Sequence, residues 1–152
     1  MCQLRDYRPG DEADVFRIVK SVLAEYGLAA NPEKTDADLK DIRQSYMAGG
    51  GAFRILEADG RPVGSYGLHA GTRASCELRK MYLLPGFRGQ GLGRRLLEDA
   101  LRTAKALGFS EVTLETNSRL KEAIGLYRAY GFTEFIPPHM SDRCDLAMKR
   151  TL

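Results

Sequence analysis

The chain has 152 residues, which is the size of a single domain and enough to bury a sizeable core. With 43% hydrophobic and 28% charged residues, its composition excludes a disordered, collagen-like or coiled-coil protein. The net charge of +3 is too small to indicate a nucleic-acid-binding protein by itself.

The N-terminal third of the chain predicts a strand followed by two helices. The strand covers residues 2–6, and Asp11 is placed to cap a first helix. Apolar residues recur at helical spacing from Val15 to Tyr26 and form the inner face of this helix. Residues 35–38 resemble a capping box, which predicts a second helix running through Leu39, Ile42 and Tyr46.

The middle of the chain predicts three strands joined as hairpins and then a long helix. The strands cover residues 52–58, 62–69 and 74–84, and Asp59-Gly60 suits the first tight turn. Leucine and alanine then recur at helical spacing between residues 92 and 107, which indicates an amphipathic helix.

The C-terminal third predicts a strand, a helix and a closing antiparallel pair. The strand covers residues 110–116, and Asn117-Ser118 is placed to cap a helix whose packed side includes Tyr127. Residues 132–136 and 143–148 form the closing pair. The element order is therefore β-α-α-β-β-β-α-β-α-β-β, which predicts an α/β fold with a mixed, mostly antiparallel sheet flanked by helices.

No repeat or linker divides the chain, so we expect one domain over residues 1–152. No apolar run is long enough to cross a bilayer, and the first residues lack the apolar region of a signal peptide. The cysteines show no C-x-x-C spacing and combine with the histidines into no zinc pattern. We therefore expect a cytoplasmic protein without a metal, whose partners include neither nucleic acid nor membrane.

A glycine-rich loop between the third predicted hairpin strand and the long helix is the main functional signal. A strand that feeds such a loop at a helix N-terminus presents free backbone N–H groups to a phosphate. Residues 79–105 carry seven Lys and Arg against two acids, a local charge of +5 that leaves −2 for the rest of the chain. The positive charge thus surrounds the loop, whose glycines are Gly86, Gly89, Gly91 and Gly93.

Two common phosphate-binding loops do not fit this sequence. A P-loop needs Lys and Ser or Thr after its last glycine, but Leu92-Gly93 stands there. A dinucleotide-binding loop needs a further glycine at position 94 or 96, and these are Arg94 and Leu96.

Three segments instead resemble the GNAT family of N-acetyltransferases. Residues 88–93 (RGQGLG) match its R/Q-x-x-G-x-G/A signature, and residues 77–85 (ELRKMYLLP) resemble its fourth strand. Residues 123–132 (AIGLYRAYGF) are similar to its A-I-x-L-Y-x-x-x-G-F helix. The spacing and the element order agree over nearly the whole chain. The resemblance implies a GNAT fold and an acyltransferase that uses acetyl-CoA as donor.

The resemblance also implies which residues bind acetyl-CoA. Backbone N–H groups of the glycine loop would bind the pyrophosphate, and arginines beside it supply positive charge. The fourth and fifth strands diverge in this family, and the exposed backbone of the fourth pairs with the pantetheine arm. An N–H near Met81 or Tyr82 would also stabilise the oxyanion of the reaction. The expected cofactor-binding residues are Met81, Tyr82, Leu83, Arg88, Gly89, Gln90, Gly91, Leu92, Gly93, Arg94 and Asn117.

Asn117 is included because of a departure from the family pattern. Many relatives carry an asparagine three residues before the Ala-Ile pair, where this chain has Leu120. Asn117 lies one turn earlier and is the candidate substitute, although helix capping explains it equally well.

The catalytic residues implied by the resemblance are Tyr127 and Glu77. Tyr127 matches the family's general acid, which protonates the leaving thiolate of coenzyme A. Glu77 matches a strand carboxylate that serves as the general base, and Glu115 on the next strand is the alternative. Glu57 and His139 are weaker candidates.

The expected function is direct transfer of an acetyl group from acetyl-CoA to a primary amine of a small molecule or peptide. The alternative is a non-catalytic CoA-binding sensor or interaction module on the same fold. No motif identifies the acceptor, and no sequence feature decides whether the chain forms a homodimer.

Overall fold

The computed structural model describes all residues, 1–152, and is built on one seven-stranded sheet. The strand order across the sheet is β1-β2-β3-β4-β5-β7-β6. Neighbouring strands are antiparallel except for the parallel pair β4–β5. The strands are β1 (Cys2–Asp6), β2 (Ala52–Ala58), β3 (Arg61–Ala70), β4 (Ser75–Leu83), β5 (Glu111–Thr116), β6 (Thr133–Phe135) and β7 (Leu146–Thr151).

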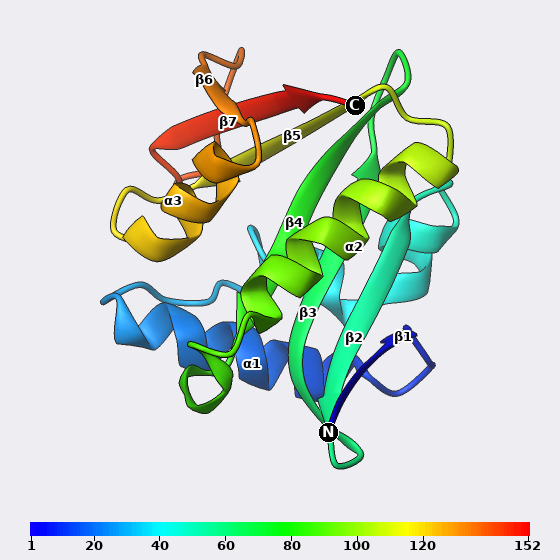
Figure 1. The fold of residues 1–152 in the computed structure, drawn as a ribbon, viewed down its shortest axis with the longest axis vertical. Coiled ribbons are helices and arrows are strands. Elements are labelled where there is room, and N and C mark those ends of the chain that lie inside the picture. The colour runs from blue at the N-terminus through cyan, green and yellow to red at the C-terminus, as the bar shows by residue number, and fades with distance from the viewer.

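Helices cover both faces of the sheet (Figure 1). Helices α2 (Leu92–Ala106) and α3 (Lys121–Ala129) pack on one face, where the larger hydrophobic core lies. Helix α1 (Glu12–Glu25) packs on the other face, over a second core that also takes side chains from two short helical turns. These turns are the 3-10 turn η1 (Ala37–Lys40) and the π-helical turn η2 (Arg43–Met47); a third, η3 (Pro85–Phe87), follows β4.

The sheet opens between β4 and β5. The two strands pair only through Ser75–Glu77 of β4 and Glu111–Thr113 of β5. Figure 1 shows them meeting near the C-terminus and diverging away from it. Beyond this short ladder, the edge of β4 that faces β5 has no strand partner, so its backbone groups are free to pair with a ligand.

A β-bulge in β4 lies within the diverging part. The register with β3 shifts between Tyr82 and Arg79, and Lys80 adopts φ +54° in the left-handed region. A bulge places two successive side chains on one side of a strand. The Lys80 side chain accordingly turns toward the α1 face, where its ammonium reaches the carbonyl oxygen of Thr35 at 3.2 Å.

The fold class and element order agree with the sequence prediction, and β1 and β2 have the predicted bounds. The second predicted helix is wrong as a single element, because the backbone is extended at Asp41 and separates η1 from η2. The apolar positions predicted for that helix are nevertheless buried: Leu39, Ile42 and Tyr46.

Asp11 is the N-cap residue of α1, as predicted, but its side chain does not cap the helix, and the Asn117-Ser118 cap is wrong. The carboxylate of Asp11 accepts hydrogen bonds from the side chain of Arg5 and the N–H of Arg8 rather than from its own helix. Helix α3 begins at Lys121, after the predicted Asn117-Ser118 cap, and no side chain caps it. The last strand, β7, lies three residues later than predicted at both ends.

Candidate active site

The glycine loop presents a row of free backbone donors. The N–H groups from Gly89 to Arg94 donate to no acceptor in the protein, and the first helical hydrogen bond beyond them runs from Arg95 to Gly91 at 3.1 Å. Gly91, with φ +76°, is the N-cap residue of α2. Free N–H groups at a helix N-terminus attract an anion. The loop therefore has the geometry of a phosphate site.

The arginines around the loop have different roles. Arg88 donates to the carbonyl oxygen of Leu83 at 2.8 and 3.0 Å and forms an ion pair with Glu25 at 2.8 Å, so it anchors the loop to β4 and α1. Arg95 turns away and donates to the carbonyl oxygen of Cys2. Arg94 lines the cavity beside the loop and is the arginine placed to face an anion there.

Two cavities adjoin in the opening of the sheet. The loop cavity, about 320 Å³, lies between the glycine loop, α1, α3 and the end of β4. The cleft cavity, about 430 Å³, lies between β4, β5, the segment 34–38 and the loop 139–144. They share four lining residues, so they form one passage past the free edge of β4: Met81, Tyr82, Leu120 and Ala123.

Tyr127 reaches the cleft cavity from α3. Its side chain packs on Phe132, with ring centroids 5.7 Å apart, and the residue is only 6% exposed. Its hydroxyl has no hydrogen-bond partner in the protein, yet it is not among the fully buried polar atoms. Burial raises the pKa of Tyr127, with a smaller contribution from Tyr82. The hydroxyl is therefore a protonated, unengaged donor at the cavity wall.

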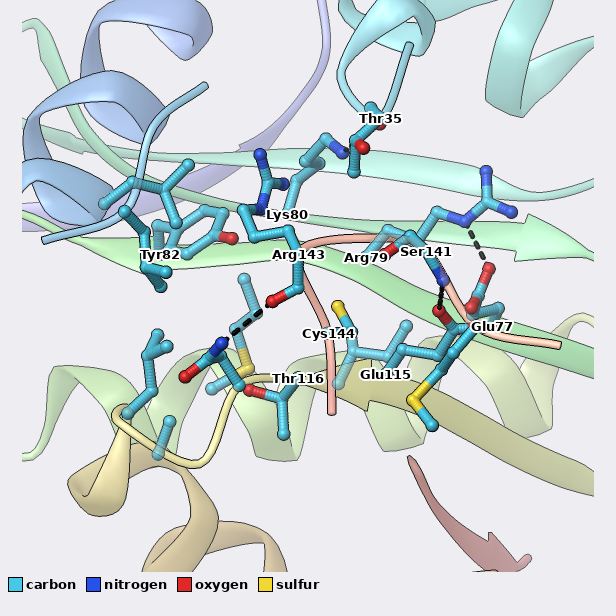
Figure 2. Close-up of a pocket in the computed structure, with 18 of the residues that line it drawn as sticks. Thr35, Glu77, Arg79, Lys80, Tyr82, Glu115, Thr116, Ser141, Arg143 and Cys144 are labelled. Atoms are coloured by element: carbon cyan, nitrogen blue, oxygen red, sulfur yellow. Dashed lines mark hydrogen bonds and ion pairs between the residues drawn. The ribbon is translucent and has the colours of Figure 1, made fainter. Parts of the chain in front are cut away.

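Two carboxylates line the same cavity from the facing strands (Figure 2). Glu77 on β4 forms an ion pair with Arg79 through one oxygen, Oε1. Glu115 on β5 accepts a hydrogen bond from the N–H of Ser141 at 3.0 Å, also through Oε1. Each carboxylate keeps a second oxygen, Oε2, for which the structure gives no partner. Either is thus able to accept a proton or bind an ammonium group.

A buried ion cluster closes the far side of the cleft cavity. Asp36 is fully buried and binds Arg143 at 2.7 Å and Lys80 at 2.9 Å. Asp38 also contacts Lys80, at 3.3 Å, and accepts a hydrogen bond from the hydroxyl of Tyr46. Although burial opposes ionisation, the hydrogen bonds from Arg143 and the charge of Lys80 lower the pKa of Asp36 to about 2.

Sequence reasoning missed this cluster. The available signal was Lys80, a charged residue inside an apolar strand segment, because a buried lysine needs an anionic partner. Its partner is not predictable, since Asp36 lies far away in the sequence and within a pattern that predicts a helix cap.

The remaining predicted residues occupy varied positions. Asn117 lines the cleft cavity, but its amide donates to the carbonyl oxygen of Arg143 at 2.9 Å and its oxygen accepts from the N–H of Arg119. Leu92 is buried in the core, and Gln90 is exposed on the loop. His139 lines the cleft cavity. Glu57 forms an ion pair with Arg5 at 2.9 Å and lines neither cavity.

Two further features concern other kinds of site. No group of His, Cys, Asp and Glu side chains is arranged to hold a metal ion. None of the helices has both the length and the hydropathy needed to span a membrane.

The chain is similar to known acetyltransferases in sequence and structure. Residues 17–132 match the model of the acetyltransferase (GNAT) family. An uncharacterized N-acetyltransferase of Escherichia coli (strain K12), YjgM, is 41% identical over 127 residues, which cover 80% of this chain and 76% of that protein. An acetyltransferase of the GNAT family from Staphylococcus aureus Mu50 superposes with a TM-score of 0.92 at 21% identity, covering 99% of both chains.

A solved relative with a ligand has the same fold. It is yncA of Salmonella typhimurium, described as a putative acetyltransferase with its cofactor acetyl-CoA. It superposes with a TM-score of 0.74 at 21% identity, covering 99% of this chain and 94% of that one.

Proposed function

The chain belongs to the acetyltransferase (GNAT) family, and we propose that it transfers an acetyl group from acetyl-CoA directly to a primary amine. One observation carries this proposal: free N–H groups of the glycine loop and the unengaged hydroxyl of Tyr127 open onto one continuous passage. The first suits the pyrophosphate of the donor, and the second suits its sulfur. We further propose that residues 1–152 form a single catalytic domain.

The residues present fit acetyl-CoA. The N–H groups from Gly89 to Arg94 would bind the pyrophosphate, with Arg94 adding positive charge. The free edge of β4 at Met81–Leu83 would pair with the pantetheine amides, because those residues line the loop cavity and β5 has already diverged from them. The acetyl end would then lie in the cleft cavity, within reach of Tyr127.

Side chains of the cleft cavity would carry the proton transfers. Glu77 takes a proton from the acceptor ammonium, which leaves a neutral nitrogen lone pair to attack the acetyl carbon. The new C–N bond would form as the C–S bond breaks, and Tyr127 would donate its proton to the leaving sulfur. The second proton that the nitrogen loses on becoming an amide would return to the Tyr127 oxygen. Glu115 is the alternative base, since it lines the same cavity with an equally free oxygen. Catalysis by such a positioned acid or base typically amounts to about 10²–10⁴-fold.

The test combines binding and turnover. Calorimetry with coenzyme A should show one site per chain, and acetyl-CoA with a panel of primary amines should release free thiol. Binding without thiol release from any amine would favour the non-catalytic CoA-binding module instead. If coenzyme A does not bind, the assignment of the glycine loop is wrong.

A further inference from the structure

The charged groups of the cleft cavity indicate what kind of amine it accepts. Its lining contains both acids and bases, and most of the bases are already neutralised. Lys80 and Arg143 are 6% and 12% exposed at the side chain and are held by Asp36 and Asp38. Lys34 lies at the rim and pairs with Asp142 at 2.8 Å. These cations have little capacity left for a ligand.

Arg79 is the exception. Its side chain is 35% exposed and its Nε donates to Glu77; the hydroxyl of Tyr46 lies beside its guanidinium, but Nη1 and Nη2 form no ion pair with a carboxylate. Burial opposes its charge, yet Glu77, Tyr46 and Asp38 raise the pKa of Arg79, so it stays cationic. The two Nη atoms form the planar pair of donors that binds a carboxylate through both of its oxygens.

Negative charge lies beside Arg79, because Glu77 is hydrogen-bonded to it. Glu77 uses Oε1 for Arg79 and keeps Oε2 free, and Glu115 on the facing strand also keeps Oε2 free. Figure 2 shows both carboxylates lying on the same side of the cavity as the head of Arg79. The cavity thus offers a binding site for an ammonium group, at the carboxylates, and one for a carboxylate, at Arg79, side by side.

An acceptor with a single kind of charge does not match these two binding sites. A diamine would place its second ammonium beside Arg79, and a simple monoamine would leave Arg79 without an anionic partner from the ligand. A compound that carries an ammonium and a carboxylate close together matches both binding sites, because Glu77 and Arg79 are themselves hydrogen-bonded neighbours.

We propose that the acceptor is an α-amino acid, with its amine at Glu77 and its carboxylate on the Nη atoms of Arg79. This inference rests on the proposed acetyl transfer and identifies its substrate class. Glu77 would receive the proton from the α-ammonium, and Arg79 would determine specificity without touching the donor. A cavity of about 430 Å³ has room for one amino acid.

The experiment compares matched acceptors that share a side chain. Each L-amino acid is tested beside its α-amide and its decarboxylated amine, and diamines are included. We expect kcat/KM to be at least about tenfold higher for the amino acid than for either analogue, because a charge-assisted bidentate contact is lost in both. Calorimetry should also show amino-acid binding to the CoA-saturated protein, a readout that does not depend on chemistry.

Three variants test the role of Arg79. Arg79→Gln should lower kcat/KM for the amino acid far more than for the decarboxylated amine, which removes the preference; a smaller loss shared by both acceptors is expected, because Arg79 also pairs with Glu77. Arg79→Lys should restore part of it, since the charge remains and the planar pair of donors is lost. Arg128→Gln is the control, because it removes an exposed arginine that pairs with Glu134 and lines neither cavity.

The outcomes separate this inference from the proposed function. Turnover of amines or diamines as good as that of amino acids would overturn the inference and leave acetyl transfer intact. An equal loss for both acceptor types in Arg79→Gln would also overturn it. Absence of thiol release with every acceptor would overturn both.

Discussion

At the scale of single residues, Tyr127 combines two roles that usually conflict. Its ring belongs to the larger core and packs on Phe132, whereas its hydroxyl faces the cleft cavity without a partner. Burial raises its pKa, so the group stays protonated at neutral pH and above. A core tyrosine whose hydroxyl has no structural contact is suited to donate its proton to something else.

The Tyr127→Phe variant should therefore lose activity but not stability. We expect kcat to fall about 10²–10⁴-fold when chemistry limits turnover, because only the proton donor is removed. Coenzyme A affinity and the free energy of unfolding should barely change, since no hydrogen bond is broken. Pre-steady-state thiol release, calorimetry and urea unfolding measure the three quantities.

Tyr130→Phe is the matched control, because Tyr130 follows α3 and lines neither cavity. An unchanged single-turnover rate in Tyr127→Phe would show that another group protonates the sulfur.

At the scale of elements, the strand–loop–helix unit from β4 to α2 is the best-predicted part of the molecule. Its signals are local: an apolar strand, glycines, and apolar residues at helical spacing. Gly91 at the start of α2 and Gly108 after its end both have positive φ, +76° and +92°, and a Cβ would meet open space at either position. A Cβ would therefore cause similar backbone strain at both glycines, and they differ only in lying at opposite ends of α2.

This pair separates binding from stability. Gly91→Ala and Gly108→Ala should each lower the free energy of unfolding by about 1–2 kcal/mol, the cost of a left-handed backbone with a Cβ. Only Gly91→Ala should weaken coenzyme A binding, at least about tenfold, because the strained loop no longer aligns its N–H groups. Urea unfolding and calorimetry measure the two effects. Equal coenzyme A affinity in both variants would exclude the loop as the phosphate site.

The failed element predictions share a physical cause. Only the short 3-10 turn η1 follows the capping box at residues 35–38, and the Asp36 side chain does not cap it, because Asp36 instead binds Lys80 and Arg143, which are distant in sequence. Just before turn η2, the N–H of Ile42 donates a hydrogen bond to the carboxylate of Glu12, 30 residues earlier in the sequence. Local sequence patterns report which residues are buried and which are polar. They do not report which distant partner satisfies a polar group.

The same limit applies to the site. The sequence proposes the loop and Tyr127 as candidates, because each belongs to a short, local motif with a family resemblance. It does not identify Arg79 and Asp36, because their importance depends on which donors and acceptors remain free after folding.

At the scale of the whole molecule, the Asp36 cluster joins parts of the chain that the sheet leaves apart. It connects the segment before η1, the bulge of β4 and the loop before β7. The pKa of Asp36 is lowered from 3.8 to about 2, chiefly by Arg143 and Lys80 against the effect of burial. A carboxyl group whose pKa is lower in the folded state stabilises the protein at pH values above its unfolded-state pKa. This stabilisation is lost as the pH falls through the folded-state pKa.

Asp36→Asn should be strongly destabilising at neutral pH, by about 3–5 kcal/mol, because it leaves the buried Arg143 without its anion and Lys80 with Asp38 alone. The difference from the wild type should shrink by about 2 kcal/mol between about pH 4 and pH 2, where the wild type protonates Asp36. Urea unfolding of both proteins over this pH range measures the difference. Asp142→Asn, which removes the exposed partner of Lys34, is the control and should match the wild type. A loss in Asp36→Asn no larger than in this control would contradict the role of the cluster.

The adjoining cavities between β4 and β5 have a kinetic consequence. Apart from four shared residues at their junction, the loop cavity and the cleft cavity are lined by different residues. Donor and acceptor would therefore meet without displacing one another, and both would be present when the acetyl group moves. Initial-rate plots should intersect rather than run parallel, and coenzyme A should compete with acetyl-CoA but not with the amine. Parallel lines would instead indicate an acetylated-enzyme intermediate, which direct transfer between donor and acceptor does not require.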